Sequence, residues 1–113
     1  MILTKQQITN AALEYLAWTG FECWRQTNNS GKRWKNNVKK GVPDILGYER
    51  NSKIARFMAC EVKTLGDRLS DDQVSFLTDL TLKGGFAFIA NQKGEVAKIT
   101  PFQEYYTPKK IRV

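Results

Sequence analysis

The chain has 113 residues, 42% of them hydrophobic and 26% charged, which allows one domain with a modest core and excludes a second domain or general disorder. Its net charge is +7. A small domain with this excess of lysine and arginine commonly binds a polyanion, with nucleic acid as the first candidate.

The absence of some residue types excludes several catalytic mechanisms. The sequence contains no histidine, which excludes Ser-His-Asp catalysis and histidine-dependent nucleases, and its two cysteines cannot complete a zinc site by themselves. We expect Cys23 and Cys60 to be small core residues of a cytoplasmic protein. No window approaches the roughly 20 apolar residues that cross a bilayer, so we expect no membrane partner.

A helix is predicted over residues 5–18, followed by a strand over 21–25. Thr4 and Gln7 have the spacing of a capping box, and Gly20 can supply the left-handed residue that ends the helix. The apolar face of this helix is expected to hold Ile8, Ala11, Ala12, Tyr15 and Leu16.

Residues 26–40 form a long polar segment with five basic residues and no acidic one. Basic side chains on either side of an aromatic residue can contact DNA phosphates while the aromatic ring stacks on a base. The alternative is a solvated loop whose Trp34 packs onto the domain. The candidate DNA-binding residues are Lys32, Arg33, Trp34, Lys35, Lys39 and Lys40.

Two strands are predicted next, over 44–48 and 54–63, joined by a hairpin that spans 49–53. Side chains alternate along a strand, so Glu61 and Lys63 share one face, and both are costly to bury unless they are paired or bind a cation. With Asp44 nearby, two carboxylates could hold a hard divalent cation. The alternative is a structural ion pair of Glu61 with Lys63, with Asp44 forming a turn.

A second capping box, Ser70 with Gln73, predicts a helix that ends at Gly84-Gly85. Its apolar stripe is Val74, Leu77 and Leu80. The run 86–90 is a buried strand, and a strand, a crossover helix and a strand indicate a parallel pair.

Residues 91–113 are expected to form a C-terminal extension. It holds a turn at 92–94, a short strand over 96–99 and a weak helix after Pro101.

Four segments in this order resemble the VRR-NUC branch of the PD-(D/E)xK nucleases: Gly41-Val42-Pro43-Asp44, Cys60-Glu61-Val62-Lys63, Leu69-Ser70-x-x-Gln73 and Gly84-Gly85-Phe86-Ala87-Phe88-Ile89. The resemblance implies an α/β fold with a restriction-endonuclease-like core, in the order helix, three strands, helix, strand, with a mixed central sheet. It implies a single nuclease domain over residues 1–113.

The same resemblance implies roles for individual residues. Asp44 and Glu61 would be metal ligands together with the backbone carbonyl of Val62, and Lys63 would position or activate the attacking water. By its own chemistry Lys63 could act as a base or stay charged and bind the phosphate. Gln73 would lie near the site, although its capping role is already a sufficient explanation. The cofactor would be Mg²⁺, with Mn²⁺ able to substitute.

The resemblance implies hydrolysis of DNA by a homodimer. The implied preference is for branched DNA such as four-way junctions. Many relatives carry a glutamate early in the first helix, whereas residues 5–7 here are Lys-Gln-Gln, which leaves the number of metal ions open. RNA is not excluded as a substrate. Two alternatives remain: a non-catalytic nucleic-acid-binding module that keeps the fold, and a scaffold that binds an acidic protein.

Overall fold

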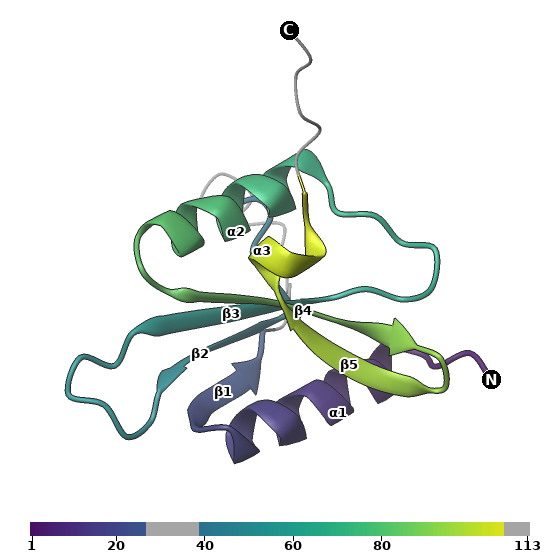
Figure 1. Ribbon diagram of the computed structural model, residues 1–113, viewed down its shortest axis with the longest axis horizontal. Helices are drawn as coiled ribbons and strands as arrows, with labels where there is room; N and C mark the ends of the chain where they lie inside the picture. The colour runs from purple at the N-terminus through teal and green to yellow at the C-terminus, as the bar shows by residue number, and fades with distance from the viewer. Residues whose placement is uncertain (27–38, 108–113) are drawn as a thin grey trace, which may run out of the picture.

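The computed structural model describes residues 1–26 and 39–107, which form a five-stranded sheet with helices on both faces (Figure 1). In chain order the elements are α1 (Lys5–Trp18), β1 (Phe21–Arg25), β2 (Ile45–Glu49), β3 (Phe57–Val62), α2 (Asp71–Leu82), β4 (Phe86–Lys93), β5 (Val96–Pro101) and α3 (Phe102–Tyr105). The predicted α/β fold, with its helix, three strands, helix and strand, is confirmed. Among the described residues, no helix is both long and apolar enough to cross a membrane.

The sheet is mixed, and its strand order follows the chain from β1 to β5. β3 pairs antiparallel with β2 and parallel with β4, so α2 is the crossover helix that parallel pairing requires. α1 lies on one face of the sheet, and α2 and α3 lie on the other (Figure 1). β3 is therefore covered on both sides, as its apolar sequence predicts.

Two small cores separate these layers. The core under α1 is built from Ile8, Leu16, Met58, Cys60 and Val62 with their neighbours. The core under α2 and α3 is built from Leu77, Ala87, Ile89 and Phe102. Alternate residues of β3 thus face different helices, and Glu61 belongs to the α2 face.

The buried stripe of α1 differs from the predicted one. Thr9 is buried, whereas Ala11 and Tyr15 are exposed. The Thr9 hydroxyl donates to the Lys5 carbonyl at 2.7 Å, which satisfies it inside the helix and makes its burial inexpensive.

β3 begins at Phe57 and not at residue 54, so the hairpin loop is longer than predicted. Ala55 has φ 50°, in the left-handed region that a regular strand does not use. The loop is closed by the Arg56 guanidinium, whose Nε lies 2.7 Å from Glu49 Oε1.

The predicted turn at 92–94 lies about two residues later, at Gly94-Glu95, because β4 continues through Lys93. Gln92 suggested a loop by its polarity, yet its side chain is buried. Its Oε1 accepts the Leu3 N–H at 2.8 Å, and its Nε2 donates to the carbonyls of Met1 and Gly94. Residues 91–101 are thus part of the sheet and not an appendage to it, and the predicted helix after Pro101 is present as α3.

Candidate active site

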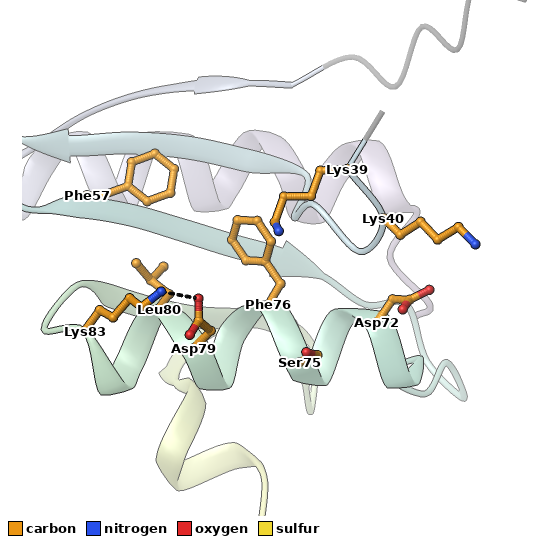
Figure 2. Close-up of a pocket in the computed structure, with 9 residues that line it drawn as sticks. All are labelled: Lys39, Lys40, Phe57, Asp72, Ser75, Phe76, Asp79, Leu80 and Lys83. Carbon is orange, nitrogen blue, oxygen red and sulfur yellow. Dashed lines mark hydrogen bonds and ion pairs between the residues drawn. The ribbon is translucent and has the colours of Figure 1, made fainter. Parts of the chain in front are cut away.

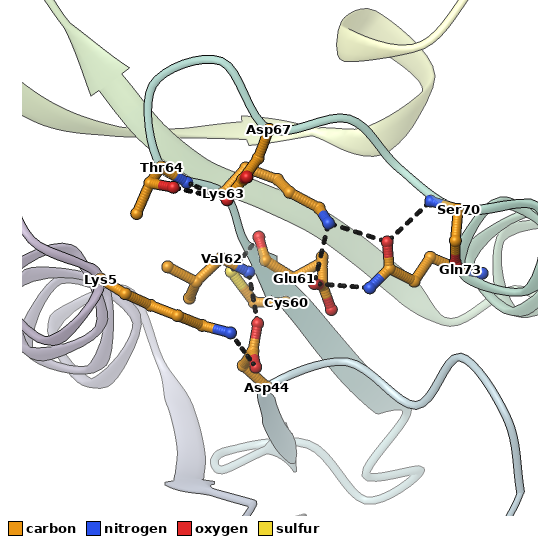
Figure 3. A network of polar contacts seen from close by, with 10 residues as sticks. All are labelled: Lys5, Asp44, Cys60, Glu61, Val62, Lys63, Thr64, Asp67, Ser70 and Gln73. Carbon is orange, nitrogen blue, oxygen red and sulfur yellow. Dashed lines mark hydrogen bonds and ion pairs between the residues drawn. The ribbon is translucent and has the colours of Figure 1, made fainter.

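Asp44 is held where β2 begins, by contacts to two other elements. Its Oδ2 accepts the backbone N–H of Val62 at 2.9 Å, and its Oδ1 lies 3.1 Å from Lys5 Nζ (Figure 3). The register pairs Ile45 with Cys60, so one step further along the strands Asp44 lies opposite Glu61. The hairpin of β2 and β3 is what brings the two carboxylates together.

Glu61 stands at the centre of this cluster, with only 2% of its surface exposed. Its Oε2 accepts from Gln73 Nε2 at 3.0 Å and lies 3.5 Å from Lys63 Nζ (Figure 3). Its Oε1 is buried and has no hydrogen-bond partner in the described part of the chain. A buried carboxylate oxygen without a partner is costly, and it is free to bind a ligand.

Gln73 connects the start of α2 to both charged residues of β3. Its backbone N–H donates to Ser70 Oγ and its Oε1 accepts the Ser70 N–H, which completes the predicted capping box. The same Oε1 accepts from Lys63 Nζ at 2.8 Å, while Nε2 donates to Glu61. The capping role and the position near the site are therefore both present in one side chain.

The electrostatics of the cluster centre on Glu61. Burial is the largest effect and Asp44 the next, and together they raise the pKa of Glu61 to about 7, against smaller opposing effects of Lys63 and Lys5. The positive charges of Lys63 and Lys5 therefore do not fully stabilise the ionised carboxylate of Glu61 near neutral pH. A divalent cation would supply that charge.

The donor set fits a hard cation. Asp44 and Glu61 are carboxylates, and Glu61 has one oxygen without a hydrogen-bond partner. The described residues contain no group of three or more His, Cys, Asp or Glu placed to hold a metal. A site with only two carboxylates suits Mg²⁺, which commonly binds through one or two carboxylates and completes its coordination shell with water and substrate phosphates.

Lys39 and Lys40 lie beside a hollow of about 470 Å³ between the sheet and α2 (Figure 2). Both are exposed, and Lys39 Nζ lies 5.8 Å from the centre of the Phe76 ring. The other basic-segment candidates, Lys32, Arg33, Trp34 and Lys35, lie outside the described residues.

Lys5 is a site residue that sequence reasoning missed. In the sequence it stands only as part of a stretch without a glutamate, yet its ammonium pairs with Asp44. No local sequence signal could have found it, because the contact depends on how α1 packs beside the start of β2 (Figure 3).

The family model described as the VRR-NUC domain matches residues 6–94, most of the chain. The chain belongs to the VRR-NUC family. It is thus a nuclease domain of the PD-(D/E)xK type, and its reaction class is phosphodiester hydrolysis.

Among solved structures, this VRR-NUC domain is similar to Hjc of Archaeoglobus fulgidus, a Holliday junction resolvase from an archaeal hyperthermophile. The TM-score is 0.53 at 24% identity, covering 87% of this chain and 77% of that one, and at this identity the likeness supports the fold alone. No curated protein sequence matches the chain.

Proposed function

We propose that this VRR-NUC domain is a divalent-metal-dependent DNA endonuclease with its active site at Asp44, Glu61, Lys63 and Gln73. The observation that carries the proposal is the buried Glu61, held between Gln73 and Lys63, with one oxygen left without a partner opposite Asp44. A purely structural ion pair would not need the second carboxylate or the open oxygen.

Asp44, Glu61 and the carbonyl of Val62 would hold the cation, with Mg²⁺ as the expected ion and Mn²⁺ as a substitute. When bound, the cation supplies Lewis acidity that offsets charge on the scissile phosphate and lowers the pKa of water. The Val62 N–H fixes the orientation of Asp44, so the ligand carboxylate is positioned before any ligand arrives.

Lys63 would position the attacking water or bind a phosphate oxygen. Its Nζ contacts two acceptors, Gln73 Oε1 and Glu61 Oε2, and an ammonium satisfies both as a donor. A third N–H is left for a phosphate oxygen or for the attacking water. Gln73 would act as a positioning residue, because it fixes both Glu61 and Lys63.

DNA would approach over the side that carries Lys39 and Lys40. The hollow there is bounded by Phe57 of β3 and Phe76 of α2 (Figure 2). Phe57 precedes Glu61 by four residues on the same strand face, so this end of the hollow lies about 13 Å from Glu61 along β3. Lysines with aromatic side chains suit a DNA strand leaving the scissile phosphate.

The preferred substrate would be branched DNA, cut by a homodimer. The structural neighbour Hjc is a Holliday junction resolvase, and a two-fold dimer presents two equivalent sites to a junction whose strands are related by the same symmetry.

The test uses end-labelled four-way junction, flap, duplex and single-stranded DNA, and a matching RNA strand, with Mg²⁺, Mn²⁺ or chelator. We expect metal-dependent cutting that is fastest on the junction, and a dimer mass by light scattering under the same conditions. Equal rates on every DNA shape would contradict the branched-DNA preference.

A non-catalytic DNA-binding module remains the second candidate, because the first turn of α1 holds no acidic residue and places Lys5 on Asp44 instead. Tight, salt-sensitive binding without cutting of any substrate would establish it.

A further inference from the structure

Lys5 occupies one side of the carboxylate that would bridge two metal ions. In two-metal nucleases the cations lie about 3.5–4 Å apart and share ligands. Here Asp44 has given Oδ2 to the Val62 N–H, and its Oδ1 faces Lys5 Nζ at 3.1 Å (Figure 3). One divalent ion can share Oδ1 with this ammonium, whereas a second ion on the same oxygen would have to displace it.

The ammonium is placed by the fold. Lys5 is the first residue of α1, and the reciprocal hydrogen bonds of Thr4 and Gln7 fix where that helix begins. Its side chain is about half exposed, whereas that of Asp44 is 20% exposed. The ammonium therefore points at the Asp44 carboxylate, with one side open to an incoming anion.

The rest of the cluster offers room for one cation. Glu61 Oε1 is the unpartnered oxygen, while Oε2 is already shared by Gln73 and Lys63. No third acidic group joins them within the described residues.

We infer that each site binds one divalent cation. The Lys5 ammonium lies beside that cation and provides the positive charge that a second cation would otherwise provide. This inference rests on the proposed function. In the DNA complex the open side of the Lys5 ammonium faces the phosphodiester, so Lys5 both limits the metal count and neutralises substrate charge.

The experiment measures Mn²⁺ binding by calorimetry and by electron paramagnetic resonance, without DNA, on the whole protein. Wild type is expected to bind one Mn²⁺ per chain. Lys5→Ala is expected to bind one ion more tightly, by about tenfold, because repulsion by the ammonium is gone. Lys5→Glu is expected to bind two, with spin coupling between neighbouring ions.

Lys53→Glu is the matched control, because it makes the same charge change in the exposed hairpin loop and should keep one ion at wild-type affinity. Two ions in the wild type would overturn the inference and leave the proposed function standing, since Lys5 would then be displaced by metal. No ion in the wild type would overturn the metal-dependent function itself. One ion in Lys5→Glu, at unchanged affinity, would also contradict the inference.

The charge role has its own measurement. At saturating Mn²⁺ and DNA, Lys5→Ala is expected to cut at least about tenfold more slowly than wild type although its metal binds more tightly. An unchanged rate would show that Lys5 limits the metal count without acting on the phosphate.

Discussion

Glu61 is a carboxyl group that the fold removes from water and places beside a second carboxylate. Its pKa is raised from 4.5 to about 7, first by burial and then by Asp44. Between these pH values the folded chain binds more protons than the unfolded chain, so the free energy of unfolding falls as pH rises.

We therefore expect the metal-free protein to lose up to about 3 kcal/mol of stability between pH 5 and pH 8, measured by urea unfolding. Mg²⁺ should oppose this loss, because it binds the deprotonated form, and its affinity should rise through the same pH range. Glu61→Gln keeps the shape of the side chain without its titration, so the variant should show a flatter pH profile and no stabilisation by Mg²⁺. A wild-type profile that rises from pH 5 to pH 8 would contradict the assignment.

Gln73 performs two tasks that can be separated. Ser70→Ala removes the hydroxyl that caps α2 and should cost about 1 kcal/mol, while the Gln73 amide still reaches Glu61 and Lys63. Gln73→Ala keeps the backbone N–H that Ser70 caps, but it removes the amide that accepts from the Ser70 N–H and contacts Glu61 and Lys63. Its additional effect should therefore appear as slower cleavage with DNA affinity nearly unchanged. If the two variants cut DNA at the same rate, Gln73 is only a cap.

At the scale of elements, the end of the basic segment is pressed against the first turn of α2. Gly41 has φ 75°, and a Cβ there would overlap the backbone carbonyl of Asp72. This contact leads the chain into Asp44 close to Gln73.

Gly41→Ala should therefore cost more than left-handed strain alone. Gly66→Ala is the matched control, because Gly66 also has a positive φ, 89°, but nothing lies near its missing Cβ. We expect about 1 kcal/mol of destabilisation for Gly66→Ala and a further 1–3 kcal/mol for Gly41→Ala, measured by thermal unfolding. Equal losses would mean that the loop does not depend on this contact.

The sequence predicted the elements whose signals are local. Both capping boxes, the crossover helix and the covered strand β3 follow from short-range patterns. It failed at Gln92, whose polar side chain indicates a turn until its partners on Met1 and Leu3 are known.

The candidate site divides in the same way. The shared face of Glu61 and Lys63 follows from strand alternation, and the place of Asp44 follows from the hairpin that was predicted. The pairing of Lys5 with Asp44 joins residues 39 positions apart on different elements, and no local pattern reports it. The roles of these residues stay predictions.

For the whole molecule, a net charge of +7 makes a salt-sensitive affinity for DNA the first expectation. Lys39→Ala with Lys40→Ala should weaken binding to every DNA shape and reduce the slope of log affinity against log salt by about 1.8 on duplex DNA. Metal-dependent turnover at saturating DNA should survive, because neither lysine belongs to the cluster around Glu61.

Lys53→Ala with Lys98→Ala removes the same charge from the hairpin loop and from β5, and serves as the control. An equal loss of affinity in the control would show a general charge effect. An unchanged DNA affinity in Lys39→Ala with Lys40→Ala would show that DNA does not bind along this edge of the hollow.

The most direct measurement is the single-turnover rate at which wild type and Asp44→Asn cut a four-way junction, with Mg²⁺ or with chelator. Asn keeps the size of the side chain and an oxygen for the Val62 N–H, but it removes the charge that would hold the cation. We expect wild-type cutting to require Mg²⁺ and to fall about 100-fold or more in Asp44→Asn. Cutting that persists in chelator, or that Asp44→Asn leaves unchanged, would contradict a metal-dependent nuclease built on Asp44 and Glu61.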